Sequence, residues 1–403
     1  MHANARAADE DRLSLALLAL LAFLSAVGPL ATDLYLPGFP RISAELAAAP
    51  LLVQLTLTSF FIGMAAGQLV FGPLSDRLGR RVPLLIGVAV SILAGAVAAL
   101  SPDIGVLVAA RCVQGFASAA GVVLGRAIIA DLAEGRAAIR AFSLLNVVFG
   151  LAPVIAPFFG GFLIESIGWR GVLWVIVALG VVSLGLSIPF VPETLPAAVR
   201  RQRAAQAHSR FPWRVLGSRA FLGFTLTGTF SFTVLFAYLA AGSFVYQDMM
   251  GFSPLGFGIA FGVTALGSMG ASALAAKMST TVRPTRVIGA GIAIQVVAGL
   301  VLLALVLAGA SPLSYIPCFF FAVSAMSLVL GNAIALALNP LREAAGTGSA
   351  VIGFIQFAVA ALAQPLVGIA GSGSALPMAL VMACAAVLAL VAFLLSRSAA
   401  SIR

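Results

Sequence analysis

The sequence predicts an all-α integral membrane protein with twelve transmembrane helices arranged as two six-helix bundles. Three observations support this fold class. Of the 403 residues, 62% are hydrophobic and 9% are charged, which leaves too little polar surface to cover a water-soluble fold. Apolar runs close to the ~20 residues that cross a hydrocarbon core recur along the chain. A single long hydrophilic interruption falls near the middle of the sequence.

The apolar runs are separated by short polar or Pro/Gly-containing breaks, and their number fits twelve crossings. The first run is too long, and at residues 33–35 too polar, for a cleaved signal peptide, so it is expected to remain as the first helix. We expect membrane-spanning helices at residues 13–39, 51–74, 82–100, 105–130, 140–164, 169–191, 219–247, 254–277, 286–309, 314–338, 349–370 and 375–396.

The long hydrophilic interruption separates six predicted helices from six. It runs from Pro192 to about Ser218 and is rich in arginine. We therefore predict an N-terminal bundle of residues 1–191, a cytoplasmic linker of residues 192–218 and a C-terminal bundle of residues 219–403. Paired six-helix halves are a recurrent plan among transporters, in which the solute is held near the membrane midplane between the halves.

The net charge of +10 raises the possibility of a nucleic-acid partner, but the positions of the basic residues argue against it. If the N-terminus is cytoplasmic, nearly all Lys and Arg fall in inner segments, and the outer loops keep only Arg41 and Arg170. This asymmetry follows the positive-inside rule. It predicts a multi-pass protein of the bacterial inner (plasma) membrane with both termini cytoplasmic and no nucleic-acid partner.

No feature of the sequence indicates an enzyme or a receptor. The three cysteines fall at unrelated spacings inside predicted helices, so neither a disulfide framework nor a metal site is indicated. There is no soluble domain, and no nucleophile–base or metal-ligand constellation is recognisable. We therefore expect no catalytic residues, no metal and no cofactor.

Three ionisable residues within the predicted helices are the first candidates for function: Asp33, Arg111 and Arg126. Inserting an ionisable group into the centre of a bilayer costs at least about 2.5–3.5 kcal/mol on membrane-insertion scales. Arg111 lies about six residues into the fourth predicted helix, which starts at the outer face of the membrane. At ~1.5 Å per residue it is roughly 10 Å deep, so it can lie at the same depth as Asp33. Burial favours the neutral form of a carboxyl group, and a nearby guanidinium favours the charged form. Asp33 and Arg111 are therefore candidates for proton coupling; the alternative is a permanent ion pair that braces the helices.

Uncharged polar and aromatic residues within the helices predict a cavity for an amphiphilic solute. Aromatic walls with a few hydrogen-bonding groups can hold such a solute loosely. For any one of these residues, packing between helices is the alternative explanation. The candidates for the lining are Tyr35, Phe61, Gln114, Asn146, Phe232, Phe236, Tyr238 and Gln356.

Residues 72–81, between the second and third predicted helices, read GPLSDRLGRR and closely resemble the signature loop of the major facilitator superfamily. In that family the Gly permits tight packing, the Asp caps a helix, and the Arg residues pair with carboxylates to lock the outward-facing state. The alternative is that the charges here only satisfy topology. The resemblance implies gating roles for Gly72, Asp76, Arg77, Gly79 and Arg80, with Asp131 as a further member by analogy.

Two more segments resemble motifs of the same superfamily. Residues 111–115 (RCVQG) resemble its second motif, whose Arg is tied to proton transfer, which again indicates Arg111. Residues 152–161 (APVIAPFFGG) are similar to the motif typical of antiporters, although Ala156 replaces the usual Gly before the second Pro. The motif residues are Pro153, Pro157, Gly160 and Gly161.

Finer likeness identifies the chain as a member of the Bcr/CflA group of bicyclomycin and chloramphenicol resistance exporters. The segments that carry it are residues 32–37 (TDLYLP), 126–131 (RAIIAD), 192–195 (PETL), 241–246 (AGSFVY) and 345–349 (AGTGS). The resemblance implies a monomeric antiporter in the lipid bilayer that exchanges amphiphilic drugs for protons, with the proton as coupling ion. Related exporters can carry a second acidic residue where this chain has Ser25, so neutral or monovalent substrates are favoured. The alternative is a proton-coupled exporter of an endogenous metabolite or amino acid.

Overall fold

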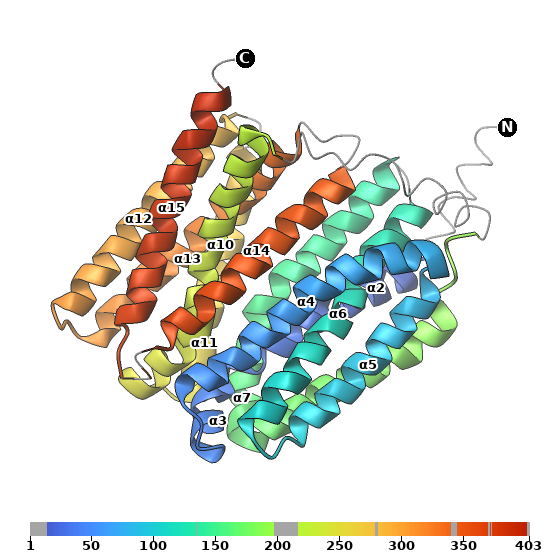
Figure 1. Cartoon of the computed structure of the whole chain (residues 1–403), viewed down its shortest axis with the longest axis horizontal. Coiled ribbons are helices and arrows are strands. Elements are labelled where there is room, and N and C mark those ends of the chain that lie inside the picture. Colours follow the sequence, from blue (N-terminus) through green and yellow to red (C-terminus); the bar gives the residue numbers. More distant parts are fainter. Residues whose placement is uncertain are drawn as a thin grey trace. The chain divides into compact units, whose positions relative to one another are not determined.

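The computed structural model describes residues 14–133, 135–196, 217–278, 281–339, 345–369, 371 and 373–400. Within these ranges the description does not extend to the side chains of residues 135–140, 142–154, 345–347, 350 and 397–400. All regular secondary structure in the described residues is helical (Figure 1).

The helices follow one another along the chain with short connections. The N-terminal half contains α2 (Leu15–Asp33), η1 (Leu36–Gly38), α3 (Phe39–Glu45), α4 (Pro50–Leu78), α5 (Arg81–Ala99), α6 (Ile104–Leu132) and α7 (Gly135–Phe190). The C-terminal half contains α10 (Arg219–Phe244), η2 (Val245–Met249), α11 (Pro254–Met278), α12 (Pro284–Leu307), η3 (Pro312–Tyr315), α13 (Ile316–Leu338), α14 (Ala345–Val367) and α15 (Leu376–Ala400).

The predicted membrane-spanning helices are confirmed. In the described residues, 10 helices are long and apolar enough to cross a membrane, and Val351–Val367 adds a shorter apolar helix. The long helix α7 contains two predicted spans, which meet at Gly168, where the backbone is non-helical with φ 71°. Because glycine tolerates positive φ at little cost, the chain can turn there between the two spans. Dividing α7 at Gly168 and counting α14 gives the twelve helices of the predicted fold class.

Polar side chains just before the apolar runs fix where several helices begin. The side chains of Ser14, Asp103 and Ser218 accept hydrogen bonds from backbone N–H groups in the first turns of α2, α6 and α10. Such caps satisfy donors that have no partner inside the helix. The sequence therefore encodes helix boundaries with small polar residues as well as with hydropathy.

The first predicted span, 13–39, is divided in the structure. The α-helix ends at Asp33, and a 3₁₀ turn over Leu36–Gly38 and the short helix α3 follow. Pro37 lacks a backbone N–H and disfavours helical geometry at the residue before it, so the α-helix stops short of it. The break places Asp33 at the C-terminal end of α2.

Contacts divide the chain into two compact units. Unit 1 comprises Met1–Tyr35, Ser59–Ala156 and Ser166–Arg210, and unit 2 comprises Leu36–Thr58, Pro157–Glu165 and Phe211–Arg403. The boundaries of these units cut across α4 and α7, so each unit takes part of both helices. The predicted division into residues 1–191, 192–218 and 219–403 follows the two sets of helices and stays a prediction.

Glycines bring α4 and α6 into close contact within unit 1. A Cβ atom at Gly63 would collide with the backbone of Cys112, and one at Gly67 would collide with the backbone of Phe116. Without side chains at these two positions the helix backbones can touch. In lipid, where the hydrophobic effect does not hold helices together, this close packing stabilises their association.

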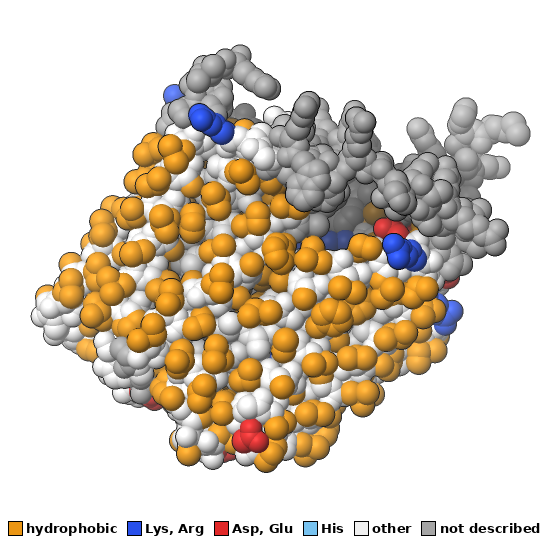
Figure 2. Space-filling view, viewed as in Figure 1, with side chains coloured by type: hydrophobic (Ala, Val, Ile, Leu, Met, Phe, Trp, Pro, Cys, Tyr) orange, Lys and Arg blue, Asp and Glu red, His pale blue; other side chains and the backbone are white. Residues whose placement is uncertain are grey.

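The surfaces of the described helices are apolar. Figure 2 shows hydrophobic side chains spread over the visible helices, with the few charged ones near helix ends. Large apolar side chains of α5 such as Ile86 and Leu93 are 55% and 66% exposed. Surfaces of this kind are stable against lipid hydrocarbon and not against water.

Candidate functional site

Asp33 is a buried carboxylate at the end of α2, inside unit 1. Asp33 is 6% exposed to solvent. The hydroxyl of Thr32 donates a hydrogen bond to its Oδ1 at 3.0 Å and also lies 2.8 Å from the carbonyl oxygen of Pro29. Within the described part of the chain Asp33 forms no ion pair. The structure therefore does not contain the permanent Asp33–Arg111 ion pair that was the alternative to proton coupling.

Arg111, on α6, is fully buried. Its Nη1 donates to Oε1 of Gln114 at 2.7 Å, and its Nη2 donates to the backbone carbonyl of Ala31 at 3.1 Å. The Nε atom has no hydrogen-bond partner among the described residues. The guanidinium carbon lies 4.7 Å from the ring centre of Tyr35 and 4.5 Å from that of Phe60.

This environment stabilises a positive charge without a carboxylate. The carbonyl of Ala31 belongs to the last turn of α2, where carbonyls lack helical partners and the helix dipole is negative. Aromatic faces attract a cation, more strongly when it is desolvated. Arg111 thus binds the backbone of the segment that carries Asp33, and the two predicted proton-coupling residues lie on neighbouring parts of unit 1.

The N-terminal candidates for the solute cavity gather around Arg111. Tyr35 and Gln114 contact its guanidinium directly, as described above. Phe61 is buried and packs edge-to-face on Phe60, with ring centres 5.9 Å apart. The side chain of Asn146 lies outside the described residues.

The C-terminal candidates divide between two places in unit 2. The rings of Phe232 and Phe236 on α10 lie 4.7 Å apart, and Phe357 on α14 packs edge-to-face on both at 5.8 and 6.1 Å. The neighbouring Gln356 is buried, and its Nε2 has no hydrogen-bond partner among the described residues. This aromatic group with one open amide donor suits the amphiphilic-solute hypothesis, and Phe357 is a member that the sequence did not single out.

Tyr238 lies in a different cluster. Its ring stacks on Phe261 at 5.3 Å and contacts Phe319 and Tyr246 at 5.5 and 6.3 Å. The residue is fully buried among these rings. Packing between helices accounts for Tyr238, and its place in a solute cavity stays a prediction.

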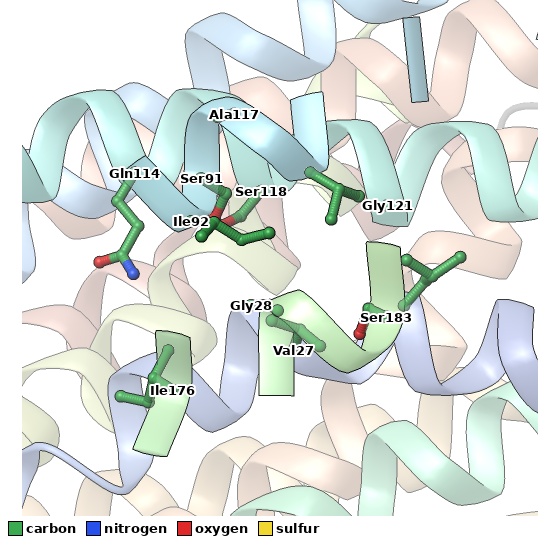
Figure 3. Close-up of a pocket in the computed structure, with 13 residues that line it drawn as sticks. Val27, Gly28, Ser91, Ile92, Gln114, Ala117, Ser118, Gly121, Ile176 and Ser183 are labelled. Atoms are coloured by element: carbon green, nitrogen blue, oxygen red, sulfur yellow. The ribbon is translucent and has the colours of Figure 1, made fainter. Parts of the chain in front are cut away.

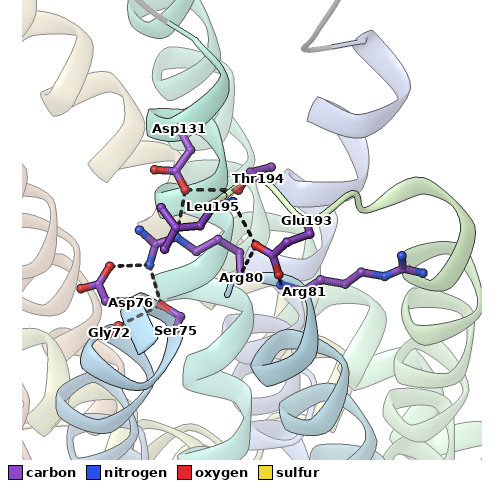
Figure 4. Close-up of polar contacts among 9 residues, drawn as sticks. All are labelled: Gly72, Ser75, Asp76, Arg80, Arg81, Asp131, Glu193, Thr194 and Leu195. Carbon is purple, nitrogen blue, oxygen red and sulfur yellow. Dashed lines mark hydrogen bonds and ion pairs between the residues drawn. The ribbon is translucent and has the colours of Figure 1, made fainter. Parts of the chain in front are cut away.

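The signature loop forms a charged cluster around Arg80 (Figure 4). Arg80 is 5% exposed, its Nε donates to Oδ2 of Asp131 at 2.9 Å, and its Nη1 lies 2.9 Å from Oδ1 of Asp76. Nη1 also donates to the hydroxyl of Ser75 at 2.6 Å, and that hydroxyl in turn donates to the carbonyl of Gly72 at 2.8 Å. Arg80 thus brings Asp76 and Asp131, two of the predicted gating residues, together in unit 1, and their role in gating stays a prediction.

Arg77, the other predicted gating cation, is exposed and forms no ion pair in the described part of the chain. The difference has a simple geometric cause. α4 ends at Leu78, and the chain turns at Gly79, where φ is 93°, so that the Arg80 side chain meets Asp76. Arg77 directly follows Asp76 on α4, and adjacent helical residues point apart.

Glu193 also belongs to this cluster, although it was not among the residues predicted from the sequence to act in gating. Its Oε1 accepts hydrogen bonds from the backbone N–H of Arg80 at 2.9 Å and of Leu195 at 3.0 Å, and its Oε2 accepts one from Arg81 at 3.3 Å. The carboxylate therefore caps the start of α5, where the helix dipole favours negative charge. An acidic residue directly after an apolar run, on the same predicted side as the signature loop, was the available signal.

Gly79 and Thr194 complete the same arrangement. Gly79 has φ 93°, and a Cβ atom there would collide with the Glu193 carboxylate. The hydroxyl of Thr194 donates to Oδ2 of Asp131 at 3.1 Å, the oxygen that Arg80 also contacts. The segment after α7 thus joins the start of α5 to the end of α6.

The antiporter-like motif lies in α7, and its residues from Pro157 to Gly161 belong to unit 2. A Cβ atom at Gly161 would collide with the backbone of Pro254, and one at Gly258 would collide with the backbone of Pro157. Gly160 is buried beside them. These residues let α7 and the start of α11 touch through their backbones. The side chain of Pro153 lies outside the described residues.

Comparison with known proteins agrees with this arrangement. The family model described as the Major Facilitator Superfamily matches residues 21–365. The chain is 35% identical over 386 residues to the "Uncharacterized MFS-type transporter YdgK" of Bacillus subtilis, which covers 95% of each protein. It is 35% identical over 382 residues to the "Bicyclomycin resistance protein homolog" of Haemophilus influenzae, covering 94% of this chain and 96% of the relative. The "Multidrug resistance protein MdtL" of Shigella dysenteriae is 28% identical over 330 residues, covering 81% of this chain and 82% of the relative.

Solved structures share the fold. A D-xylose–proton symporter matches with a TM-score of 0.74 at 16% identity, covering 93% of this chain and 96% of the symporter. A bacterial homologue of the human lysosomal transporter Spinster, in an inward-facing and occupied conformation, matches with a TM-score of 0.73 at 16% identity, covering 95% and 96%. The family match, the two relatives at 35% identity and the shared fold together show that the chain belongs to the major facilitator superfamily of membrane transporters, as a Bcr/CflA-type member.

Proposed function

We propose that the protein exports drug-like solutes from the cell in exchange for protons by alternating access. The observation that carries the proposal is Asp33, a buried carboxylate that forms no ion pair with any residue the structure describes and lies next to the α2 carbonyl that Arg111 binds. The names of the relatives, which refer to bicyclomycin and multidrug resistance, support drugs as the cargo. The proton needs no cofactor, because a single carboxyl group can carry it.

The coupling step uses Asp33 in two forms. Neutral Asp33 keeps its hydrogen bond with Thr32 and leaves Arg111 on the Ala31 carbonyl. Loss of the proton creates a carboxylate two residues along the chain from that carbonyl, and the buried guanidinium is attracted to it. A proton that binds Asp33 from outside and leaves it inside therefore changes the contacts between α2 and α6, and drug occupies the cavity in the alternate step.

The driving force suffices for useful export. One charge moved down a potential of 100 mV supplies about 2.3 kcal/mol. That free energy supports about a forty-fold concentration ratio of a coupled neutral solute. Ser25, which replaces a second acidic residue in related exporters, is buried and donates to the backbone carbonyl of Gly121 at 3.3 Å. A single acidic residue on this helix favours neutral or monovalent drugs.

The solute is held in unit 2 by the aromatic group of Phe232, Phe236 and Phe357 with Gln356. Rings and one amide donor can bind many amphiphilic molecules with little geometric demand. The Arg80 cluster gates the cycle, because its ion pairs with Asp76 and Asp131 must break if α4, α5 and α6 rearrange. The protein works as a monomer in the bacterial inner membrane, with both termini in the cytoplasm.

A resistance assay with the intact protein tests the function. Cells that carry the gene should survive higher doses of phenicols, bicyclomycin or cationic dyes than cells with an empty vector, and a protonophore should abolish the difference. Unchanged survival across a panel of unrelated antibiotics, together with increased secretion of one cellular metabolite or amino acid, would instead support the alternative of a metabolite exporter.

A further inference from the structure

A small cavity lies inside unit 1, between α2, α5, α6 and the second half of α7 (Figure 3). Its volume is about 20 Å³. A cavity needs roughly 10–15 Å³ on this measure to hold one water molecule. The cavity therefore has room for one water and is far too small for a drug.

One wall of the cavity carries an unused hydrogen-bond donor. Gln114 is 2% exposed, and its Oε1 accepts from Arg111. Its amide nitrogen, which bears two N–H donors, has no hydrogen-bond partner among the described residues. Figure 3 shows this nitrogen on the side of the other lining residues and the oxygen on the opposite side. An N–H donor in a protein interior is stabilised by a hydrogen-bond partner, which the cavity can supply as water.

Three serine hydroxyls that line the cavity offer acceptors: Ser118 lies one turn from Gln114 on α6, Ser91 lies on α5 and Ser183 lies on α7. The oxygens of Ser91 and Ser118 lie 3.0 Å apart, so one of them donates to the other and both retain free lone pairs. Ser183 donates to the carbonyl of Leu179 at 2.8 Å, which leaves its oxygen able to accept. A buried water is stable when it makes 2–4 hydrogen bonds. Figure 3 shows Ser183 at the far end of the cavity from Gln114, so the water is placed between the Gln114 amide and the Ser91–Ser118 pair.

We propose that this cavity is a binding site for one ordered water molecule, which accepts a hydrogen bond from the Gln114 amide nitrogen and donates to the serine oxygens. The water fixes the orientation of the amide, so that Oε1 of Gln114 points to Arg111. A cation is disfavoured, because the site presents an N–H donor and adjoins the buried guanidinium. The site is independent of which solute the transporter carries.

The direct test is an experimental structure of the full-length protein in lipid nanodiscs, at a resolution that shows ordered waters. The expected result is one water peak within hydrogen-bond distance of the Gln114 amide nitrogen and of a serine oxygen. An empty cavity, while other buried waters in unit 1 are visible, would overturn the proposal. So would a lipid tail or an ion in the cavity, or an amide nitrogen that bonds a protein oxygen instead.

A pair of glycine variants tests the role of the water. Gly28 lines the cavity, and a Cβ atom there would lie 3.0 Å from the flexible end of Met64 and 3.9 Å from Cβ of Ser118, so Gly28→Ala narrows the space. Gly185→Ala is the control, because a Cβ atom there meets nothing within 4 Å. In Gly28→Ala the water peak should disappear and the Gln114 amide should turn, whereas the control should keep both. Loss of the water with an unchanged amide, or retention of both, would contradict the proposal.

Discussion

Arg111 donates a hydrogen bond to the backbone carbonyl of Ala31, at the end of the helix that carries Asp33. The guanidinium is thus tied to the main chain and to Gln114, and in the described residues it forms no ion pair. A buried charge that is held by dipoles and aromatic faces keeps its place when Asp33 is neutral. The same charge binds a carbonyl two residues from Asp33 in the chain, so it can respond when Asp33 is ionised.

The hydrogen-bonding geometry of the Arg111 guanidinium is expected to affect transport more than its charge does. Arg111→Lys retains the cation but cannot donate in the same geometry to both Ala31 and Gln114. Loss of one hydrogen bond from a charged group costs about 1.5–3 kcal/mol, so proton-driven drug transport in proteoliposomes should fall roughly 10- to 100-fold. Transport at the wild-type rate would show that only the charge is needed.

Gly79 should not tolerate a side chain, whereas Gly72 should. Gly79→Ala places a Cβ at φ 93° and against the Glu193 carboxylate, whereas a Cβ at Gly72 meets nothing within 4 Å. A non-glycine residue at positive φ costs about 1–3 kcal/mol, so Gly79→Ala should lower the midpoint of thermal unfolding in detergent. Gly72→Ala should leave it nearly unchanged. Adding Glu193→Ala should not restore stability, because it removes the collision but also the cap of α5.

Arg80 is expected to carry more of the gating than Arg77. Arg80→Ala removes the ion pairs with Asp76 and Asp131 and leaves Asp131 buried with one partner fewer. Turnover should fall while the drug Kd changes little, because the cluster lies in the signature loop and not among the solute-cavity candidates. Arg77→Ala should impair turnover less. Equal turnover in Arg80→Ala and wild type would show that the cluster has no part in gating. Unchanged turnover in Arg77→Ala would show that Arg77 has none.

Phe357 is expected to contribute to drug affinity. Phe357→Ala removes the edge-to-face contacts with Phe232 and Phe236. Phe357→Ala also removes a ring on which an aromatic drug can pack, a contact worth about 0.5–1.5 kcal/mol beyond area burial, so the Kd should rise roughly 2- to 10-fold in equilibrium binding. Phe354→Ala is the matched control, since this ring of the same helix is 41% exposed. Equal effects of the two substitutions would exclude Phe357 from the binding group.

The helices could be predicted from the sequence because lipid imposes a simple rule of length and polarity. The predicted span 254–277 differs from α11, Pro254–Met278, by a single residue. The division of the first span was harder, since hydropathy continues through Pro37 although the backbone there cannot remain helical. The turn at Gly168 could be predicted, because Glu165 and Arg170 interrupt the apolar sequence there and the predicted spans 140–164 and 169–191 lie on either side of it.

Part of the site could be predicted from the sequence. The depth in the membrane made Asp33 and Arg111 candidates together, and the resemblance of the signature loop indicated Asp76, Arg80 and Asp131 as gating residues. Contacts between helices were not predictable, because they depend on how two helices are rotated and shifted against each other. Phe60, Phe357 and Glu193 were missed for that reason: each acts through a partner distant in sequence.

The most direct test of the account is proton-driven drug transport by Asp33→Asn in proteoliposomes, with an imposed pH gradient and with drug gradients alone. Asparagine preserves the size of the side chain and can accept from Thr32, but it cannot carry a proton. We expect no uphill transport in response to the pH gradient, while downhill drug exchange continues. Full proton-driven accumulation of drug by Asp33→Asn would contradict the account, because the exchange would then run without this carboxyl group.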